Sequence, residues 1–98
     1  MYVVRDVFHC KPGHAKSVAD KFKNSLLHMK NMKSFKGGRV LVDYVAEYWT
    51  VVLETEIESL GDFESQMNEY ASNQQMRDTM KGYMDEVDGG HREVFRIV

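Results

Sequence analysis

Residues 39–57 have the sequence RVLVDYVAEYWTVVLETEI and form the most β-prone stretch of the chain. From Trp49 to Ile57, apolar and polar side chains alternate with a period of two, which is typical of a strand with one buried face. Residues 39–47 alternate in the same way, and a turn near residues 46–48 would join the two segments as an antiparallel hairpin. The stretch therefore predicts two adjacent strands against which the rest of the chain packs.

The segment before this hairpin predicts a strand followed by a helix. Side chains alternate over residues 1–9, and Pro12 and Gly13 end that strand. An apolar stripe with spacings of three and four residues then predicts an amphipathic helix. The stripe consists of Ala15, Val18, Ala19, Phe22, Leu26 and Met29.

The segment after the hairpin predicts a broken helix and a last strand. Ser59, with an acidic residue three positions later, is a helix start. The apolar stripe that follows changes phase, and Ser72 with a glutamine three residues later fits a second capping box. We therefore expect a break near Ser72 and a short third helix that ends at residues 88–90, DGG. Residues 91–98 alternate as a strand.

The predicted order of elements is the βαββαβ order of a ferredoxin-like α+β fold. We expect a single domain over residues 1–98, with a four-stranded antiparallel sheet and the helices on one face. The larger apolar row of each strand should face the helices, and these rows include Trp49, Val51, Leu53 and Phe95. The opposite face would mix apolar side chains with charges of both signs: Leu41, Val45, Val52, Val94, Arg39, Asp43, Glu47, Glu54, Glu56, Arg92 and Arg96. Such a face can complement itself across a twofold axis, so we expect a homodimer built through it.

The composition is that of a globular protein in water. Hydrophobic residues make up 43% and charged residues 29% of the 98 residues, and no apolar run approaches the roughly 20 residues that span a bilayer. The first residues lack the pattern of a signal peptide, and the one cysteine, Cys10, has no partner for an internal disulfide. We expect a cytoplasmic protein without a membrane partner.

The charge is unevenly distributed along the chain. Residues 11–39 hold eight Lys or Arg and one acidic residue, whereas residues 40–98 hold 13 acidic and four basic residues. Two oppositely charged helices side by side would account for this pattern, because they attract each other. No aromatic residues interleave with the lysines as stacking platforms for bases, so we do not expect a nucleic-acid partner.

Three short motifs resemble the dimeric α/β-barrel superfamily. They are KPGH at residues 11–14, YWTVV at residues 48–52 with SL at residues 59–60, and GHREVFR at residues 90–96. The antibiotic-biosynthesis-monooxygenase and NIPSNAP-like branches are the most similar. The resemblance implies that two subunits pair their sheets into a barrel, with a small-molecule pocket between sheet and helices in each. Members of the superfamily include cofactor-free oxygenases of aromatic polyketides, haem-degrading enzymes, isomerases and proteins of unknown role.

The haem-degrading members use an Asn, a Trp and a His. In the first strand, this chain has Arg5 and Asp6 where the Asn would stand, so the resemblance does not extend to haem degradation.

Five polar and aromatic residues would share one space if the larger apolar row of each strand faces the helices. Asp6 and His91 would be the catalytic acid and base, because a carboxylate and an imidazole in an apolar pocket acquire shifted pKa values. Tyr44, Trp49 and Glu93 would bind the substrate. On the predicted helices, Met67 and Tyr83 would line the same pocket, since methionine adapts to irregular apolar ligands. Some of these residues also have a structural alternative: Asp6 paired with an arginine, His91 exposed, Trp49 in the core, and the methionines as ordinary core packing.

No metal site or cofactor is expected. His9, Cys10 and His14 lie close in sequence, but neighbours on a strand point to opposite faces and no fourth ligand is apparent. The glycine pairs at residues 37–38 and 89–90 lack the spacing of a phosphate-binding loop.

Two functions therefore remain open. One is a cofactor-independent monooxygenase or isomerase acting on an apolar or aromatic compound, and the other is a non-catalytic binding or assembly module. An enclosed cavity with convergent polar groups would favour the enzyme, and a filled interface between helices and sheet would favour the module.

Overall fold

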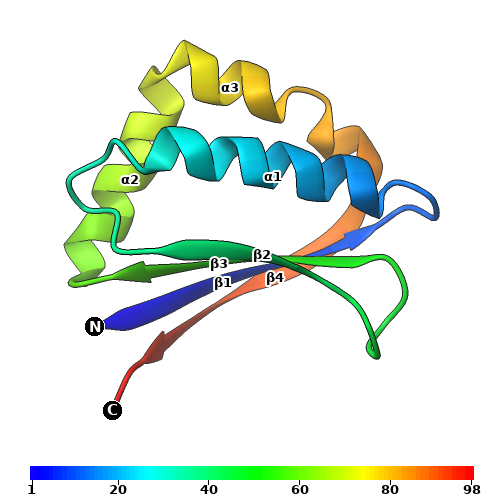
Figure 1. Cartoon of the computed structure of the whole chain (residues 1–98), viewed down its shortest axis with the longest axis horizontal. Helices are drawn as coiled ribbons and strands as arrows, with labels where there is room; N and C mark the ends of the chain where they lie inside the picture. Colours follow the sequence, from blue (N-terminus) through cyan, green and yellow to red (C-terminus); the bar gives the residue numbers. More distant parts are fainter.

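The computed structural model describes all 98 residues, and it confirms the ferredoxin-like α+β fold (Figure 1). The strands form one antiparallel sheet in the order β2-β3-β1-β4. The elements are β1 (Tyr2–Cys10), α1 (Ala15–Met29), β2 (Gly38–Val42), β3 (Thr50–Ile57), α2 (Leu60–Ser72), α3 (Gln74–Met80), the 3-10 helix η1 (Tyr83–Glu86) and β4 (Val87–Arg96).

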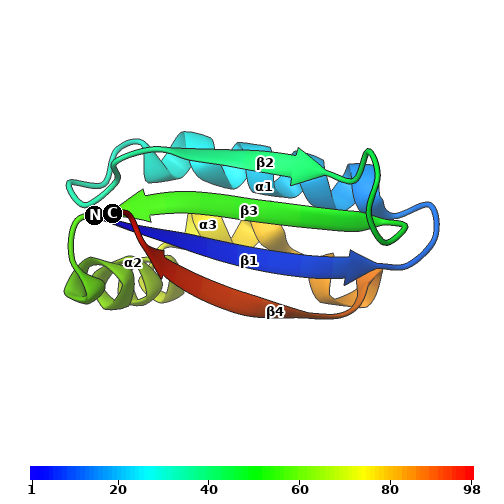
Figure 2. The same ribbon diagram turned by 90° about the horizontal axis from the view of Figure 1, so that it is seen from below.

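All helices lie on one face of the sheet, and the other face is open (Figures 1 and 2). The predicted apolar stripe of α1 forms the centre of the core, because Val18 and Phe22 are almost fully buried. They pack with Val51 of β3 and Met80 of α3. A second group of buried side chains, Leu26, Met29, Met32 and Met76, continues this core along α1. None of the helices could cross a bilayer.

The predicted break in the second helical segment is confirmed. Ser59 caps α2 in a capping box with Asp62, as the sequence predicts. The helix ends at Ser72, and α3 begins one residue later than expected, because Asn73 supplies the cap and accepts a hydrogen bond from the Met76 N–H at 3.1 Å.

The hairpin is shorter than predicted. β2 ends at Val42 and β3 begins at Thr50, so residues 43–49 form a loop that extends to the open side of the sheet in Figure 1. The Asp43 carboxylate accepts a hydrogen bond from the Thr50 N–H at 3.0 Å and so closes the loop. Trp49 takes a positive φ of 63° and does not belong to the strand. The prediction of a strand over residues 39–47 is therefore wrong beyond Val42.

β4 begins at Val87, and residues 88–90 lie within this strand instead of ending a helix. Gly90 allows the close pairing with β1, since a Cβ at this position would lie 2.0 Å from the carbonyl oxygen of Val7.

The two faces of β4 are also the reverse of the prediction. The register pairs Val94 with Val4 and Arg92 with Asp6, so Val94, Arg92 and Arg96 face the helices while Phe95 lies on the open face. Both rows of β4 contain a large apolar residue, so its alternation could not fix the register.

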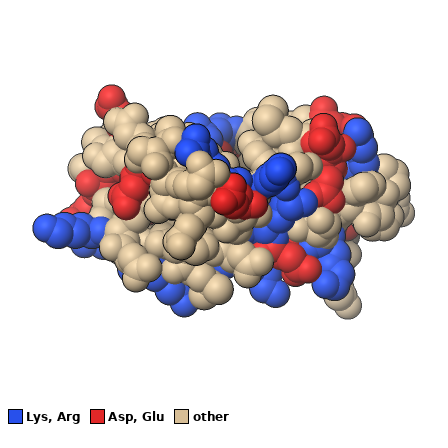
Figure 3. Space-filling view, turned by 90° about the horizontal axis from the view of Figure 1, so that it is seen from above, with Lys and Arg blue, Asp and Glu red and all other residues tan.

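Charged side chains of both signs alternate over the helix-covered surface (Figure 3). The uneven charge of the sequence is therefore mixed in space. One ion pair joins the basic segment, residues 11–39, to the acidic segment, residues 40–98: Lys21 of α1 pairs with Glu86 of η1.

Candidate functional site

A cavity of about 140 Å³ lies between the sheet and the helices. Its floor comes from β1, β3 and β4, and its walls come mainly from α1, α2, α3 and η1. Most of the lining is sulfur or aromatic, a surface that suits apolar ligands. The lining methionines and aromatic residues are Met29, Met32, Met67, Met76, Met80, Phe22, Phe63, Tyr70 and Tyr83.

One ion pair provides the charge in this lining. Asp6 of β1 and Arg92 of β4 lie opposite each other in the sheet, and Arg92 Nε donates a hydrogen bond to Asp6 Oδ1. The Asp6 side chain is 17% exposed and that of Arg92 is 45% exposed. The Arg92 guanidinium also lies 4.8 Å from the centre of the Phe63 ring, a cation–π contact that ties β4 to α2.

Neutral polar groups complete the wall. Burial, with a smaller contribution from Tyr83, raises the pKa of the Tyr70 hydroxyl above its ordinary value of 10.0, so Tyr70 stays protonated at neutral pH. Gln66 is buried and is held in place because its Nε2 donates to Ser34 Oγ at 3.2 Å. Tyr83 packs edge-on against Phe8 at 6.0 Å between ring centres. The polar side chains of the cavity are thus fixed by packing or by hydrogen bonds.

The seven residues predicted to form a site do not all meet. Asp6, Met67 and Tyr83 line the cavity. Tyr44 and Trp49 lie in the β2–β3 loop, where Tyr44 is fully exposed and Trp49 is 41% exposed.

His91 and Glu93 project from the open face, because the register puts them in the row that alternates with Arg92 and Val94. The prediction that Asp6, Tyr44, Trp49, His91 and Glu93 share one space is therefore wrong. Of these five residues, Asp6 alone lines the cavity.

Sequence reasoning missed Arg92 and Tyr70 at the cavity. A signal for Arg92 was present, since one charge of each sign, Asp6 and Arg92, falls in the middle of two strands that must neighbour each other in this fold. Tyr70 lies on the predicted α2 stripe, where it looks like an ordinary core residue.

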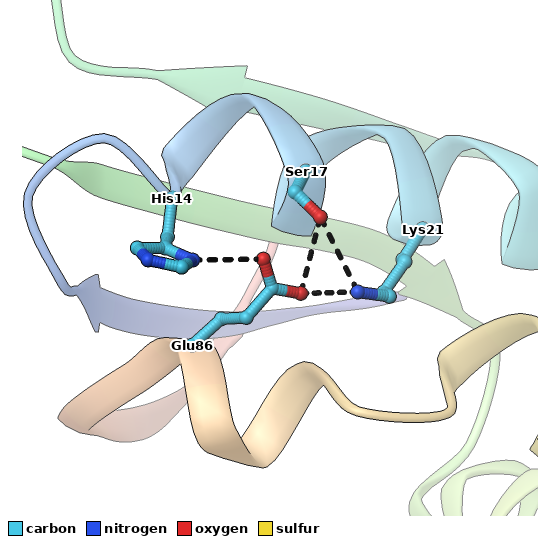
Figure 4. A network of polar contacts seen from close by, with 4 residues as sticks. All are labelled: His14, Ser17, Lys21 and Glu86. Atoms are coloured by element: carbon cyan, nitrogen blue, oxygen red, sulfur yellow. Dashed lines mark hydrogen bonds and ion pairs between the residues drawn. The ribbon is translucent and has the colours of Figure 1, made fainter.

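A separate polar cluster lies outside the cavity, between the first turns of α1 and η1 (Figure 4). Glu86 accepts hydrogen bonds from Lys21, from Ser17 at 3.1 Å and from His14 at 3.1 Å. These partners, Lys21 above all, lower the pKa of Glu86 from 4.5 to about 2 although burial opposes the shift. The cluster fastens η1, and with it Tyr83 of the cavity, to α1.

The three residues considered for a metal site point apart. Cys10 is buried in the core, where burial raises its pKa, whereas His9 lies on the open face and His14 is bound to Glu86. The structure contains no group of three or more His, Cys, Asp or Glu side chains arranged to hold a metal ion.

The open face of the sheet combines apolar and charged side chains. Glu54 accepts a hydrogen bond from Arg39 at 2.6 Å and lies 3.3 Å from Arg5 Nε. Val7 and Val52 lie opposite each other in the sheet and are each 8% exposed although no helix covers them. Phe95 remains 49% exposed.

No family model and no curated protein sequence matches the chain. Solved structures do. An antibiotic biosynthesis monooxygenase superposes with a TM-score of 0.77 at 11% identity, covering 100% of this chain and 99% of that one. A NIPSNAP family protein from Agrobacterium tumefaciens gives 0.79 at 10% identity, covering 99% and 92%. A NIPSNAP-like domain protein from Burkholderia xenovorans gives 0.82 at 11% identity, covering 99% and 84%.

At these identities the agreement concerns the course of the backbone over the whole chain, and it confirms at that level the resemblance seen in the sequence motifs. The chain has the ferredoxin-like fold of the antibiotic biosynthesis monooxygenase and NIPSNAP proteins.

Proposed function

We propose that the protein binds a small apolar or aromatic molecule in the cavity between sheet and helices. The observation that carries this proposal is the cavity itself. It has a volume of about 140 Å³, is open to solvent on one side and is lined largely by methionine and aromatic side chains, and its two charged residues, Asp6 and Arg92, form an ion pair with each other. Well-packed cores contain few spaces larger than a water molecule, so an apolar cavity of this size beside a sheet supports the proposal of a small-molecule site.

Filling the cavity tests the proposal. Ser25 of α1 is buried and lines the cavity, so Ser25→Leu places a branched side chain inside it. The matched control is Asn24→Leu, which adds the same side chain to the exposed surface of the same helix. We expect toluene to raise the Tm of the wild type and of Asn24→Leu, but not that of Ser25→Leu. An equal rise in all three proteins would contradict binding in the cavity.

The catalytic form of this function is a cofactor-independent monooxygenase or isomerase. Asp6 is the one carboxylate that lines the cavity, and it would accept a proton from a ligand hydroxyl or from a C–H beside a carbonyl. Arg92 would stabilise the negative charge left on the ligand. Proton removal of this kind begins both isomerisation and direct reaction of an electron-rich ring with oxygen. The name of one structural neighbour, an antibiotic biosynthesis monooxygenase, is consistent with this form.

The alternative is a non-catalytic binding or assembly module, and the Asp6–Arg92 ion pair favours it. Arg92 already compensates the Asp6 carboxylate, and His91, the predicted catalytic partner, lies on the other face of the sheet. Asp6→Asn separates the two forms once a ligand is known. An enzyme would lose turnover by at least about 100-fold, since a general base contributes roughly that factor or more, whereas a binding module would show no turnover in either protein.

We also propose that the protein is a homodimer paired through the open face. Phe95, 49% exposed, and the partly exposed Leu41 supply apolar area there, and Arg5, Arg39, Glu54 and Glu93 supply charges of both signs. A second copy rotated about a twofold axis would present the same groups in the opposite order. Light scattering at micromolar concentration should give twice the chain mass of 11.4 kDa, and a mass of 11.4 kDa would contradict the proposal.

A further inference from the structure

We propose that the cavity selects neutral molecules with one six-membered ring and one hydroxyl group, of the size of p-cresol. This inference rests on the proposed function, that the cavity binds an apolar molecule, and adds a size, a charge and a polar group to it.

Cavity volume sets the size. An apolar protein cavity of about 150 Å³ accommodates benzene, so the cavity of about 140 Å³ has room for one six-membered ring. One ring with a small substituent fills this volume, whereas a second fused ring would extend through the open side of the cavity, beside the exposed Met67 and Arg92, into solvent. The deep wall is packed against the rest of the core, because Met76 and Met80 are 2% and 5% exposed and Phe22 is 3% exposed.

The ion pair sets the charge. Asp6 and Arg92 are the charged groups of the lining, and they bind each other. An anionic ligand would have to draw Arg92 away and leave Asp6, which is only 17% exposed, without its partner. A cationic ligand would draw Asp6 away from Arg92 in the same manner. A neutral ligand disturbs neither group.

The free oxygen of Asp6 sets the polar group. Arg92 donates to Oδ1, so Oδ2 retains lone pairs that can accept a hydrogen bond from a ligand. A hydroxyl group on the ring can donate this bond while the ring lies against Phe22, Phe63 and the methionines. Without the hydroxyl, the ligand would cover Oδ2 and leave it unpaired, which is unfavourable.

Isothermal titration at pH 7 with four probes tests these three features. They are p-cresol, toluene without the hydroxyl, 4-methylbenzoate with a negative charge, and 2-naphthol with a second ring. We expect the wild type to bind p-cresol at least about 10-fold more tightly than each of the other three.

Two variants invert the selectivity. Asp6→Asn releases Arg92 from its partner, so 4-methylbenzoate should gain at least about 10-fold in affinity while p-cresol weakens. Phe63→Ala enlarges the cavity and should admit 2-naphthol, whereas Leu60→Ala, which removes a 56% exposed side chain of the same helix outside the cavity, should not. Thermal melting confirms that each variant is folded before it is titrated.

The outcomes separate the selectivity from the function. If 2-naphthol or 4-methylbenzoate binds the wild type as tightly as p-cresol, the inference is wrong and the cavity still binds apolar ligands. If toluene matches p-cresol, the role of Asp6 Oδ2 is wrong. If none of the four probes binds, the proposed function itself fails.

Discussion

The Glu86 carboxylate joins two segments that lie 65 or more residues apart in the sequence. Lys21, Ser17 and His14 come from α1, whereas Glu86 comes from η1. Hydrogen bonds to a charged group are among the stronger polar contacts in proteins, and the Glu86 side chain is only 13% exposed. This single side chain therefore fixes how η1 lies against the first half of the protein.

Glu86→Gln should lower the free energy of unfolding at pH 7 by about 1 to 3 kcal/mol, because the amide keeps the shape but loses the charge. The folded-state pKa of Glu86, about 2, lies below its ordinary value of 4.5. The stabilisation is thus complete above about pH 4.5 and is lost as the pH falls toward 2, so the difference between variant and wild type should shrink in that interval. Urea denaturation followed by circular dichroism at several pH values measures this difference in the free energy of unfolding.

The neighbouring residue supplies the control. Asp85 is exposed and makes none of these contacts, so Asp85→Asn should change stability by less than about 0.5 kcal/mol at any pH. A pH-independent deficit in Glu86→Gln would show that the loss comes from altered packing instead of the lost charge.

Two adjacent glycines of β4 should respond very differently to alanine. A Cβ at Gly90 would lie 2.0 Å from the backbone oxygen of Val7, so Gly90→Ala must push β4 away from β1 and should cost about 1 to 3 kcal/mol or more. A Cβ at Gly89 meets nothing within 4 Å, so Gly89→Ala should stay within about 1 kcal/mol of the wild type. Urea denaturation of both variants measures the contrast, and equal effects would contradict the close approach of the two strands.

At the level of elements, α3 is the short segment that closes the cavity. It has only seven residues, too few for a helix that is stable by itself, yet it places Met76 and Met80 in the lining. The Asn73 cap and the burial of these two methionines hold it in place.

Asn73→Ala should destabilise the protein by about 0.5 to 2 kcal/mol, because the Met76 N–H loses its partner at the start of α3. Asn73→Asp should retain most of the stability, since a carboxylate caps equally well. Ser72→Ala is the control, because Ser72 closes the end of α2 and does not cap α3. Thermal unfolding ranks the three variants, and similar Tm values for Asn73→Ala and Asn73→Asp would argue against the cap.

Most elements and their order could be predicted, because strong periodic patterns and capping residues specify them locally. The α1 stripe and the Ser59 cap are examples. The β2–β3 loop could not be predicted, since residues 43–47 continue an alternating pattern while the Asp43 contact with Thr50 ends the ladder. That contact depends on tertiary geometry.

The candidate site was predicted less well, because it depends on the register of β4. Val94 and Phe95 are both apolar, so either row of the strand could have faced the helices, and a shift of one residue exchanges Arg92 for His91 and Glu93. The observed register places Gly90 where it approaches the β1 backbone too closely for any side chain, and the alternation of β4 gives no sign of this contact.

At the level of the whole molecule, helices cover one face of the sheet, and the open face is the proposed interface of the homodimer. Among the strand residues of that open side, Phe95 is the largest exposed apolar side chain, at 49%. Phe95→Glu should convert the homodimer to a monomer, because a charge without a partner would be buried at the interface. Leu27→Glu is the matched control: Leu27 is 59% exposed on α1, on the helix side.

Light scattering should give 11.4 kDa for Phe95→Glu and twice that mass for Leu27→Glu. Unchanged dimers in both variants would place the interface elsewhere, and monomers in both would point to a general loss of structure, which circular dichroism would reveal.

Five of the seven methionines line one cavity, so the side chains that are most easily oxidised are concentrated at the proposed binding site. Peroxide converts a thioether into a polar sulfoxide, and Met67, 42% exposed, would be attacked before the four buried residues. A single oxygen atom on this side chain would make the cavity wall more hydrophilic and weaken the binding of apolar ligands without unfolding the chain. Oxidation of these methionines would thus lower the affinity of the cavity for apolar ligands, and methionine sulfoxide reductase would restore it.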